Sequence, residues 1–168
     1  MFNGIVDQQQ VPYVPHSLTL QQPWQVEFVE NHAKTQVQLP HDWSQDNTSA
    51  IRFYSGTAIY RTTFNYKESP SGRVVLNLGE VHDLAHVYLN DVDCGIAWTS
   101  PYEVDVTKAI QEGKNNLRID VVNTWHNALK GLDAGTPPFD GIWTNARYRT
   151  KGDSLLPAGL FGPVQFKW

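Results

Sequence analysis

The sequence predicts an all-β protein in which two antiparallel sheets pack face to face. Three observations support this fold class: apolar and polar residues alternate in short segments, these segments are regularly spaced, and turn-forming residues separate them. Because side chains alternate between the two faces of a strand, one face of each segment is expected to form the core. Strands are expected near residues 24–28, 58–64, 74–78, 85–90, 102–106, 117–121 and 164–168.

The predicted domain is preceded by a short segment without periodicity. Residues 1–16 contain three consecutive glutamines and two prolines, and they are expected to form an extended arm or a linker. Residues 17–168 are assigned to one β-sandwich domain, because a chain of 168 residues is long enough for one sizeable core.

Turn signals divide the strand segments. Residues 69–72, the pair Asn90 and Asp91, and residues 112–115 are expected to close hairpins, since Asn, Asp and Gly adopt positive φ at little cost. The only helical turn expected lies at Thr107–Gln111, because a threonine precedes it and a glycine follows it.

One segment lacks the alternation of the rest. Residues 126–162 are rich in glycine and contain Pro137 and Pro138, so a long loop is expected there. Phe139, Trp143 and Tyr148 argue against disorder, because such rings usually pack against other groups. We therefore expect the loop to cover one end or edge of the sandwich.

The inward-facing positions of the strand segments define the predicted core. Large apolar and aromatic side chains at these positions are expected to meet between the two sheets. They are Trp24, Tyr60, Leu76, Val87, Leu117, Ile119 and Phe166, and the terminal Trp168 is expected to be buried as well.

Composition limits the classes of partner. The formal net charge of −4 lacks the basic excess that nucleic-acid binding requires, so no nucleic-acid partner is expected. No apolar run is long enough for a membrane helix, and residues 1–10 do not resemble a secretion signal. Charged residues are 18% of the chain and aromatic residues 12%, which suits contact with neutral polar ligands or with other protein domains.

No catalytic or metal-binding signature is found. Because the segment around His82 and His86 is strand-like, these side chains should lie about 13 Å apart, too far to bind one ion. Asp91 and Asp93 are better explained by a tight turn than by calcium, and the lone Cys94 excludes an internal disulfide. We therefore predict no metal, no cofactor and no catalytic residue, and expect the isolated chain to be inactive.

The tryptophans outside the regular strands are the candidate binding residues. Trp98, Trp125 and Trp143 either stack on the apolar face of a sugar ring or anchor a loop to the sandwich, and the anchor interpretation is favoured because Trp is usually buried. If strand-end aromatic and polar groups converge at one rim, that rim is the predicted ligand or partner site. The candidate residues are Trp98, Tyr102, Trp125, Asn127, Asp140, Trp143 and Arg147.

Several motifs together resemble a known family. They are residues 39–43 (LPHDW), 54–64 (YSGTAIYRTTF), 78–81 (LGEV), 85–90 (AHVYLN), 95–107 (GIAWTSPYEVDVT), 113–117 (GKNNL), 122–127 (VNTWHN) and 159–164 (GLFGPV). As a set covering residues 24–168, they resemble the sugar-binding β-sandwich of family 2-like glycoside hydrolases. They look closest to the C-terminal sandwich of large bacterial α-L-rhamnosidases.

This resemblance implies a galactose-binding-like jelly-roll sandwich that forms part of a larger α-L-rhamnosidase-like enzyme. It also implies a catalytic domain of the same polypeptide as partner, and a periplasmic or extracellular location. The chain departs from the family patterns at two places. The rhamnosidase-like pattern continues with an arginine where this chain has Ala128, and Gly162-Pro163 replaces an aspartate of the β-galactosidase-like branch.

Three functions are compatible with the sequence. The first is a non-catalytic accessory domain of a glycoside hydrolase, which either packs on a neighbouring domain or binds neutral carbohydrate weakly. The second is a free-standing lectin-like carbohydrate-binding module, and the third is a small enzyme. An aromatic patch that meets another domain would favour the first, and an exposed groove lined by Trp and amides would favour the second.

Overall fold

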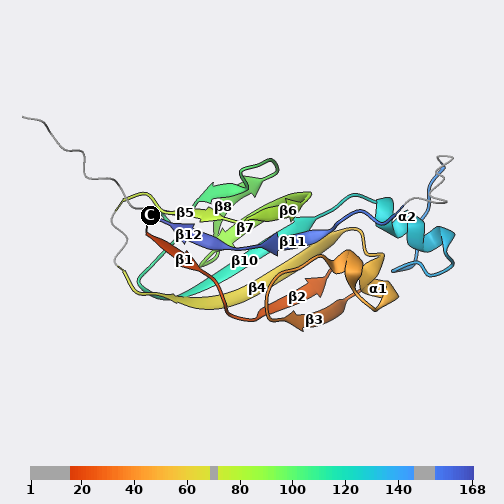
Figure 1. Ribbon diagram of the computed structural model, residues 1–168, viewed down its shortest axis with the longest axis horizontal. Coiled ribbons are helices and arrows are strands. Elements are labelled where there is room, and N and C mark those ends of the chain that lie inside the picture. Colours follow the sequence, from red (N-terminus) through yellow and green to blue (C-terminus); the bar gives the residue numbers. More distant parts are fainter. Residues whose placement is uncertain (1–15, 69–71, 146–153) are drawn as a thin grey trace, which may run out of the picture.

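The computed structural model describes residues 16–68, 72–145 and 154–168, which form a β-sandwich (Figure 1). A six-stranded antiparallel sheet has the order β3-β2-β4-β10-β7-β8, and a four-stranded antiparallel sheet has the order β1-β12-β5-β9. A third pair, β11-β6, completes the β structure.

The larger sheet comprises β2 (Trp24–Phe28), β3 (Ala33–Val37), β4 (Thr57–Tyr66), β7 (Leu84–Leu89), β8 (Val92–Ala97) and β10 (Gly113–Val122). The smaller sheet comprises β1 (Ser17–Thr19), β5 (Val75–Asn77), β9 (Glu103–Asp105) and β12 (Gln165–Lys167). The remaining pair is β6 (Glu80–His82) with β11 (Gly159–Gly162). The predicted all-β antiparallel sandwich is confirmed.

Two long central strands organise the larger sheet. β4 and β10 pair over their whole length, from Tyr66 opposite Gly113 to Thr57 opposite Val122. Along β4 the side chains from Ala58 onward alternate between buried and more exposed positions, as the sequence predicts. All seven side chains predicted to lie in the core are buried.

Trp168 was predicted to be buried in the core, and the structure differs. Its ring is only partly buried, because it follows the last strand at the edge of the core and packs edge-on against Tyr66 at 5.1 Å. One face stacks on His16 at 6.0 Å, and its indole nitrogen donates to the Glu68 carboxylate at 2.6 Å. This tryptophan therefore closes the edge of the sandwich.

The segment expected to be one long loop contains regular structure. Helix α2 (His126–Asp133) begins after β10, and β11 lies near the end of the segment. The loop prediction is wrong for these two elements. Two shorter helices, η1 (Trp43–Gln45) and α1 (Ser49–Arg52), were also not predicted.

Two local predictions are confirmed. Asn90 and Asp91 have φ of 52° and 64°, as a tight hairpin between β7 and β8 requires. The helical turn predicted at Thr107–Gln111 also forms: the carbonyl of Val106 accepts hydrogen bonds from the backbone amides of Ala109 and Ile110. None of the helices in the described part of the chain is long and apolar enough to cross a membrane.

Candidate functional site

The end of the sandwich that carries α2 holds most of the predicted site residues. Helix α2 packs closely here: a Cβ added at Gly131 would lie 2.8 Å from the Cβ of Phe53, which follows α1. The hydroxyl of Ser55 accepts from the backbone amide of Ala128 at 3.0 Å and fixes the first turn of α2. Figure 1 shows α2 at the opposite end of the molecule from the C-terminus.

Asn127 is buried and holds two backbone segments together. Its side chain is 1% exposed, and its amide makes two hydrogen bonds with the backbone of Leu156. The side-chain nitrogen donates to the Leu156 carbonyl at 2.8 Å, and the side-chain oxygen accepts from the Leu156 amide at 2.9 Å. Asn127 was predicted to contact a ligand, but here it ties α2 to the segment that leads into β11.

A series of aromatic contacts runs from the core to this end. The ring of Tyr54 packs edge-on against Phe28 and Trp43, with centroid distances of 4.7 and 5.8 Å. Phe139 packs against Tyr54 at 6.0 Å, and Trp125 packs against Phe139 at 6.1 Å. The loop after α2 is therefore anchored by Phe139, and Trp125 is held on its outer side.

Three tryptophans are strongly exposed. The exposed fractions are 72% for Trp98, 51% for Trp125 and 76% for Trp143. The favoured interpretation of these rings as buried anchors is wrong for Trp98 and Trp143. Trp125 is partly an anchor and partly exposed, because its ring packs against Phe139 and half of its surface remains exposed.

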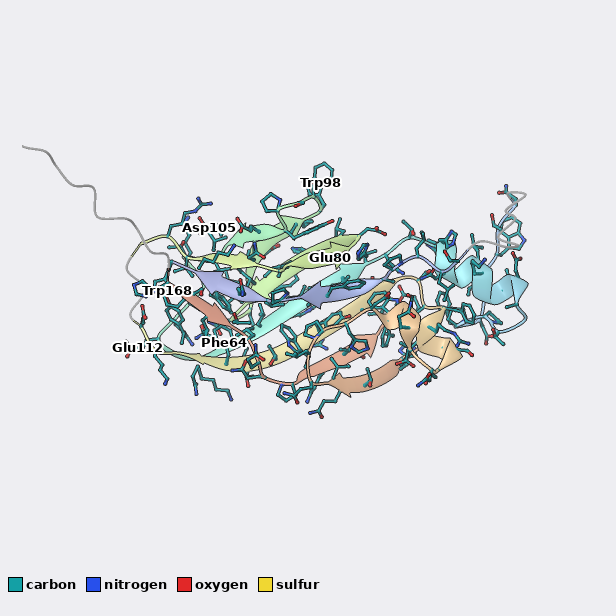
Figure 2. The ribbon with its side chains drawn as sticks, in the orientation of Figure 1. Phe64, Glu80, Trp98, Asp105, Glu112 and Trp168 are labelled. Atoms are coloured by element: carbon teal, nitrogen blue, oxygen red, sulfur yellow. The ribbon has the colours of Figure 1, made fainter. Side chains whose placement is uncertain are left out.

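The predicted site residues form two separate groups. No hydrogen bond or ring contact among the described residues connects one group to the other. Trp125, Asp140 and Trp143 lie at the α2 end, and Asp140 is exposed. Trp98 and Tyr102 flank the connection from β8 to β9, where the carbonyl of Tyr102 accepts from Leu78 at 2.9 Å. Figure 2 shows Trp98 projecting from the β8 side of the sandwich, away from α2.

Arg147, the remaining predicted site residue, lies outside the described residues. We call the exposed side chains at the α2 end the α2 surface. Its described members are Trp125, Leu132, Asp140, Trp143 and Leu156.

Two carboxylates near this end have local structural partners. Asp42 accepts hydrogen bonds from the amides of Ser44 and Ala158, and Asp83 accepts one from the amide of Thr124. Hydrogen bonds from Thr107, and to a smaller extent from Arg73, hold the pKa of Asp105 below its usual value.

Every described carboxylate whose pKa is shifted has a lowered pKa, because hydrogen bonds stabilise its ionised form. They are Glu27, Asp93, Glu103 and Asp105. A general acid for glycoside cleavage needs a raised pKa.

The two histidines considered as metal ligands have separate partners. A ring nitrogen of His82 lies 2.8 Å from Glu80, and one of His86 lies 2.9 Å from Asp93. Within the described ranges, no three His, Cys, Asp or Glu side chains gather in a way that could hold a metal ion.

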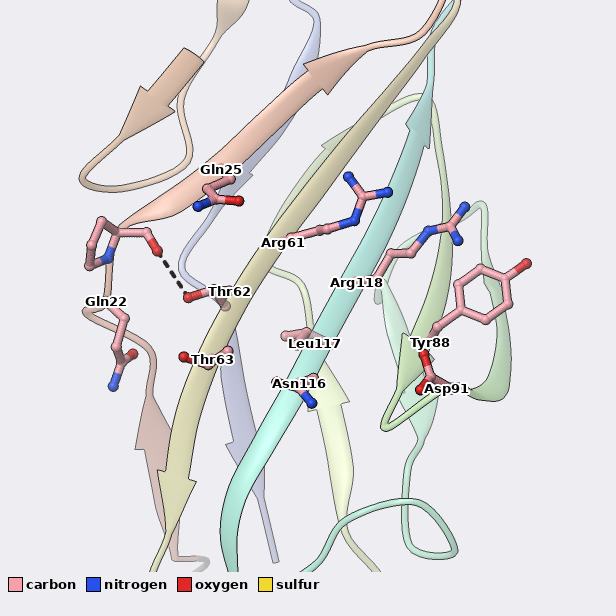
Figure 3. Close-up of a pocket in the computed structure, with 11 residues that line it drawn as sticks. Gln22, Gln25, Arg61, Thr62, Thr63, Tyr88, Asp91, Asn116, Leu117 and Arg118 are labelled. Atoms are coloured by element: carbon pink, nitrogen blue, oxygen red, sulfur yellow. Dashed lines mark hydrogen bonds between the residues drawn. The ribbon is translucent and has the colours of Figure 1, made fainter. Parts of the chain in front are cut away.

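A second candidate site was not predicted from the sequence. A hollow of about 650 Å³ lies on the outer face of the six-stranded sheet, and we call it the sheet-face hollow (Figure 3). It is lined by Gln22, Pro23, Gln25, Arg61, Thr62, Thr63, Tyr88, Asp91, Asn116, Leu117 and Arg118. Outward polar residues on strands resemble an ordinary solvated face in the sequence, and only the strand register brings these side chains together.

Comparison with protein families identifies the chain. Residues 24–151 match the model of the glycosyl hydrolase 2 galactose-binding domain-like family. The chain belongs to this family. The matched range covers both central strands and α2, so the predicted galactose-binding-like fold is confirmed.

Similar proteins agree with this assignment. A rhamnosidase from Novosphingobium sp. PP1Y is 31% identical, with a TM-score of 0.83, over 92% of this galactose-binding-like chain and 15% of the rhamnosidase chain. A putative beta-glucuronidase from Formosa agariphila is 30% identical over 92% of this chain and 16% of its own length. A beta-D-glucuronidase from Dictyoglomus thermophilum shares the fold, with 18% identity and a TM-score of 0.64, over 91% of this chain and 28% of its own.

The predicted resemblance to glycoside hydrolase sandwich domains, with a rhamnosidase among the neighbours, is thus confirmed. The galactose-binding-like chain spans less than one third of each of these relatives.

Proposed function

We propose that this chain is a non-catalytic accessory domain of a larger α-L-rhamnosidase-like glycoside hydrolase. In this proposal the α2 surface packs against the catalytic domain of the same polypeptide. The observation that carries the proposal is the exposure of Trp125 and Trp143 at one end of the sandwich.

The α2 surface has the composition of a protein contact. Trp143 is 76% exposed and Leu156 45% exposed, and large exposed apolar side chains that gather at one place mark interaction sites. Tryptophan is also enriched at the centres of protein interfaces, where it supplies a large contact area. Phe139 holds the ring of Trp125 from the inside, so less side-chain freedom is lost when a partner covers its outer face.

The relatives support a multidomain parent. The chain corresponds to 15% of the Novosphingobium rhamnosidase and to 16% of the Formosa protein. Most of each relative therefore lies outside the matched region, where a catalytic domain would be found.

The test compares Trp143→Ala in the isolated chain and in the full parent polypeptide. In the isolated chain the melting temperature should change by less than about 2 °C, because an exposed ring contributes little to folding. In the parent, loss of a central interface ring should weaken domain packing by about 2 kcal/mol and lower the melting temperature.

Trp98→Ala is the matched control, since Trp98 is exposed to a similar degree but lies outside the α2 surface. Equal effects of the two substitutions in the parent would contradict the proposal. So would hydrolysis of aryl glycosides by the isolated chain, if that activity disappeared when one Asp or Glu was changed to its amide.

The alternative is a free-standing lectin-like module that binds neutral carbohydrate. It is favoured by the same exposed rings, because Trp125 and Trp143 offer flat apolar faces on which a sugar can stack. In this case the isolated chain should bind a neutral oligosaccharide in calorimetry, and Trp143→Ala should abolish binding without changing the melting temperature.

A further inference from the structure

The floor of the sheet-face hollow contains a row of polar side chains that crosses four strands. In the antiparallel register, Gln25 of β2 lies opposite Arg61 of β4, Arg61 lies opposite Arg118 of β10, and Arg118 lies opposite Tyr88 of β7. Figure 3 shows these four side chains on the same face of the sheet. The row lies on the central strands, so its backbone positions are rigid.

Two arginines face each other in the middle of this row. Like charges placed directly opposite on neighbouring strands destabilise a sheet. Glu27 lies 3.3 Å from Arg61, and Asp120 lies 2.6 Å from Arg118, but neither carboxylate is among the residues that line the hollow. Of the described lining residues, Asp91 is the only acidic one. The hollow therefore presents two guanidinium groups whose counter-charges lie outside it.

Both arginines keep donors for a ligand. Arg118 uses Nε and Nη2 to bind Asp120, at 2.8 and 2.6 Å, and its guanidinium lies 5.0 Å from the centre of the Tyr88 ring. These contacts hold Arg118 in place and leave Nη1 without a partner among the described residues. Arg61 donates only from Nη1, to Glu27 at 3.3 Å, so its Nε and Nη2 are likewise unpaired within the described structure.

The other lining groups suit hydroxyl-rich ligands. Gln25, Thr63 and Asn116 line the hollow with amides and a hydroxyl, which donate and accept hydrogen bonds. Tyr88 is the only aromatic side chain of the described lining, and Arg118 covers part of its ring.

We propose that the sheet-face hollow binds an acidic saccharide. A carboxylate or sulfate group of the sugar lies between Arg61 and Arg118, where its oxygens accept hydrogen bonds from the unpaired guanidinium N–H groups and its charge screens the two positive charges from each other. The sugar hydroxyls bind Gln25, Thr63 and Asn116. This site is separate from the α2 surface, so it can be tested independently of domain packing.

The test uses three matched polymers: dextran, carboxymethyl dextran and dextran sulfate. The isolated chain is run in native gels that contain increasing amounts of each polymer, and retardation gives the dissociation constant. We expect binding to at least one charged dextran, with no retardation by neutral dextran. The carboxymethyl and sulfate polymers distinguish a uronate-like ligand from a sulfate ester. Binding should weaken at high salt, because the contacts are partly exposed.

Variants locate the site. Arg61→Gln and Arg118→Gln should each weaken binding about tenfold, because each removes a charge-assisted hydrogen bond. Arg73→Gln is the matched control: Arg73 is also exposed and also paired with a carboxylate, Asp105, but it lies outside this hollow. Melting curves of the three variants check that folding is unchanged.

Each other outcome overturns the proposal. Failure to bind either charged dextran would mean that the hollow does not bind an acidic saccharide. Equal retardation by neutral dextran would mean that binding does not depend on charge. An equal loss in Arg73→Gln would show that binding reflects overall charge and not this hollow.

Discussion

Replacing Asn127 by alanine tests how the α2 end is held together. The side chain of Asn127 is buried, and its amide hydrogen-bonds both backbone groups of Leu156, donating to the carbonyl and accepting from the N–H. Alanine removes both and leaves the Leu156 amide and carbonyl without these partners. The segment that leads into β11 then loses its main polar attachment to α2.

The expected destabilisation follows from these two bonds. Each hydrogen bond contributes about 1 kcal/mol net, and an unsatisfied buried group adds a further penalty, so Asn127→Ala should cost about 2–3 kcal/mol. For a domain of this size, 1 kcal/mol corresponds to about 2–4 °C in melting temperature. The expected decrease is therefore about 4–12 °C.

Thermal unfolding followed by circular dichroism measures this decrease. Asn47→Ala is the matched control, since Asn47 is exposed and its variant should melt within about 2 °C of the unmodified chain. Hydrogen exchange at the Leu156 amide gives a local measure: exchange should accelerate in Asn127→Ala and stay unchanged in Asn47→Ala.

Asn127→Asp tests how the stability contributed at this position changes with pH. An ionised aspartate here still accepts from the Leu156 amide but faces the Leu156 carbonyl, so burial and this contact should raise its pKa. A group with a raised pKa in the folded state favours folding at low pH and loses that contribution as pH rises. The stability deficit relative to the unmodified chain should thus be smaller at pH 4 than at pH 7.

The reasoning is refuted if Asn127→Ala melts like the unmodified chain. That result would mean that water replaces both bonds at no cost, and it would restore Asn127 as a candidate ligand contact.

Three further predictions concern the rest of the fold. Asn115→Ala should cost about 3 kcal/mol in urea unfolding, because its fully buried amide bonds two carbonyls, an amide and a second side chain; less than 1 kcal/mol would contradict this. Gly131→Ala should cost about 1–3 kcal/mol, since the new methyl group meets Phe53, and an unchanged melting temperature would show that α2 can shift. Asp105 has a lowered pKa because of Thr107, so its contribution is present above about pH 4 and lost as pH falls below it; Asp105→Asn should flatten that part of the stability-pH curve, and an unchanged curve would exclude the contribution.

The sequence predicts the central strands well because their alternation is strong. β4 and β10 each have one mostly apolar buried face, with Thr62 and Asn115 as its polar members, and this pattern indicates strands without further information. The edge strands β3 and β8 are missed, because no side chain of β3 is buried and the side chains of β8 show no clear alternation. Pairing with a neighbouring strand, and not the local sequence, makes them β structure.

The helix α2 could not be predicted for a similar reason. Its sequence contains Gly131 in the middle and no side-chain cap, which are poor helix signals. The helix forms because Asn127, Ala128 and Gly131 face the sandwich and are buried against it. These contacts depend on residues distant in the chain, such as Phe53 and Ser55.

The choice of site residues stays a prediction. For the tryptophans, an average tendency toward burial gave the wrong exposure for Trp98 and Trp143. The row from Gln25 to Tyr88 was missed because its members are far apart in the sequence. Their meeting depends on the strand order β2-β4-β10-β7.

The pairing of β1 with β12 determines how the molecule responds to a pulling force. Ser17 lies opposite Lys167, and the amide of His16 donates to the carbonyl of Trp168 at 3.0 Å, so the first and last described residues are neighbours. Tension applied through these two residues therefore peels the strands apart one pair at a time, whereas strands pulled from opposite ends must break all their bonds together. β1 has three residues and lies at a sheet edge, so it should detach first under load. The central strands and α2 would still be folded at that point.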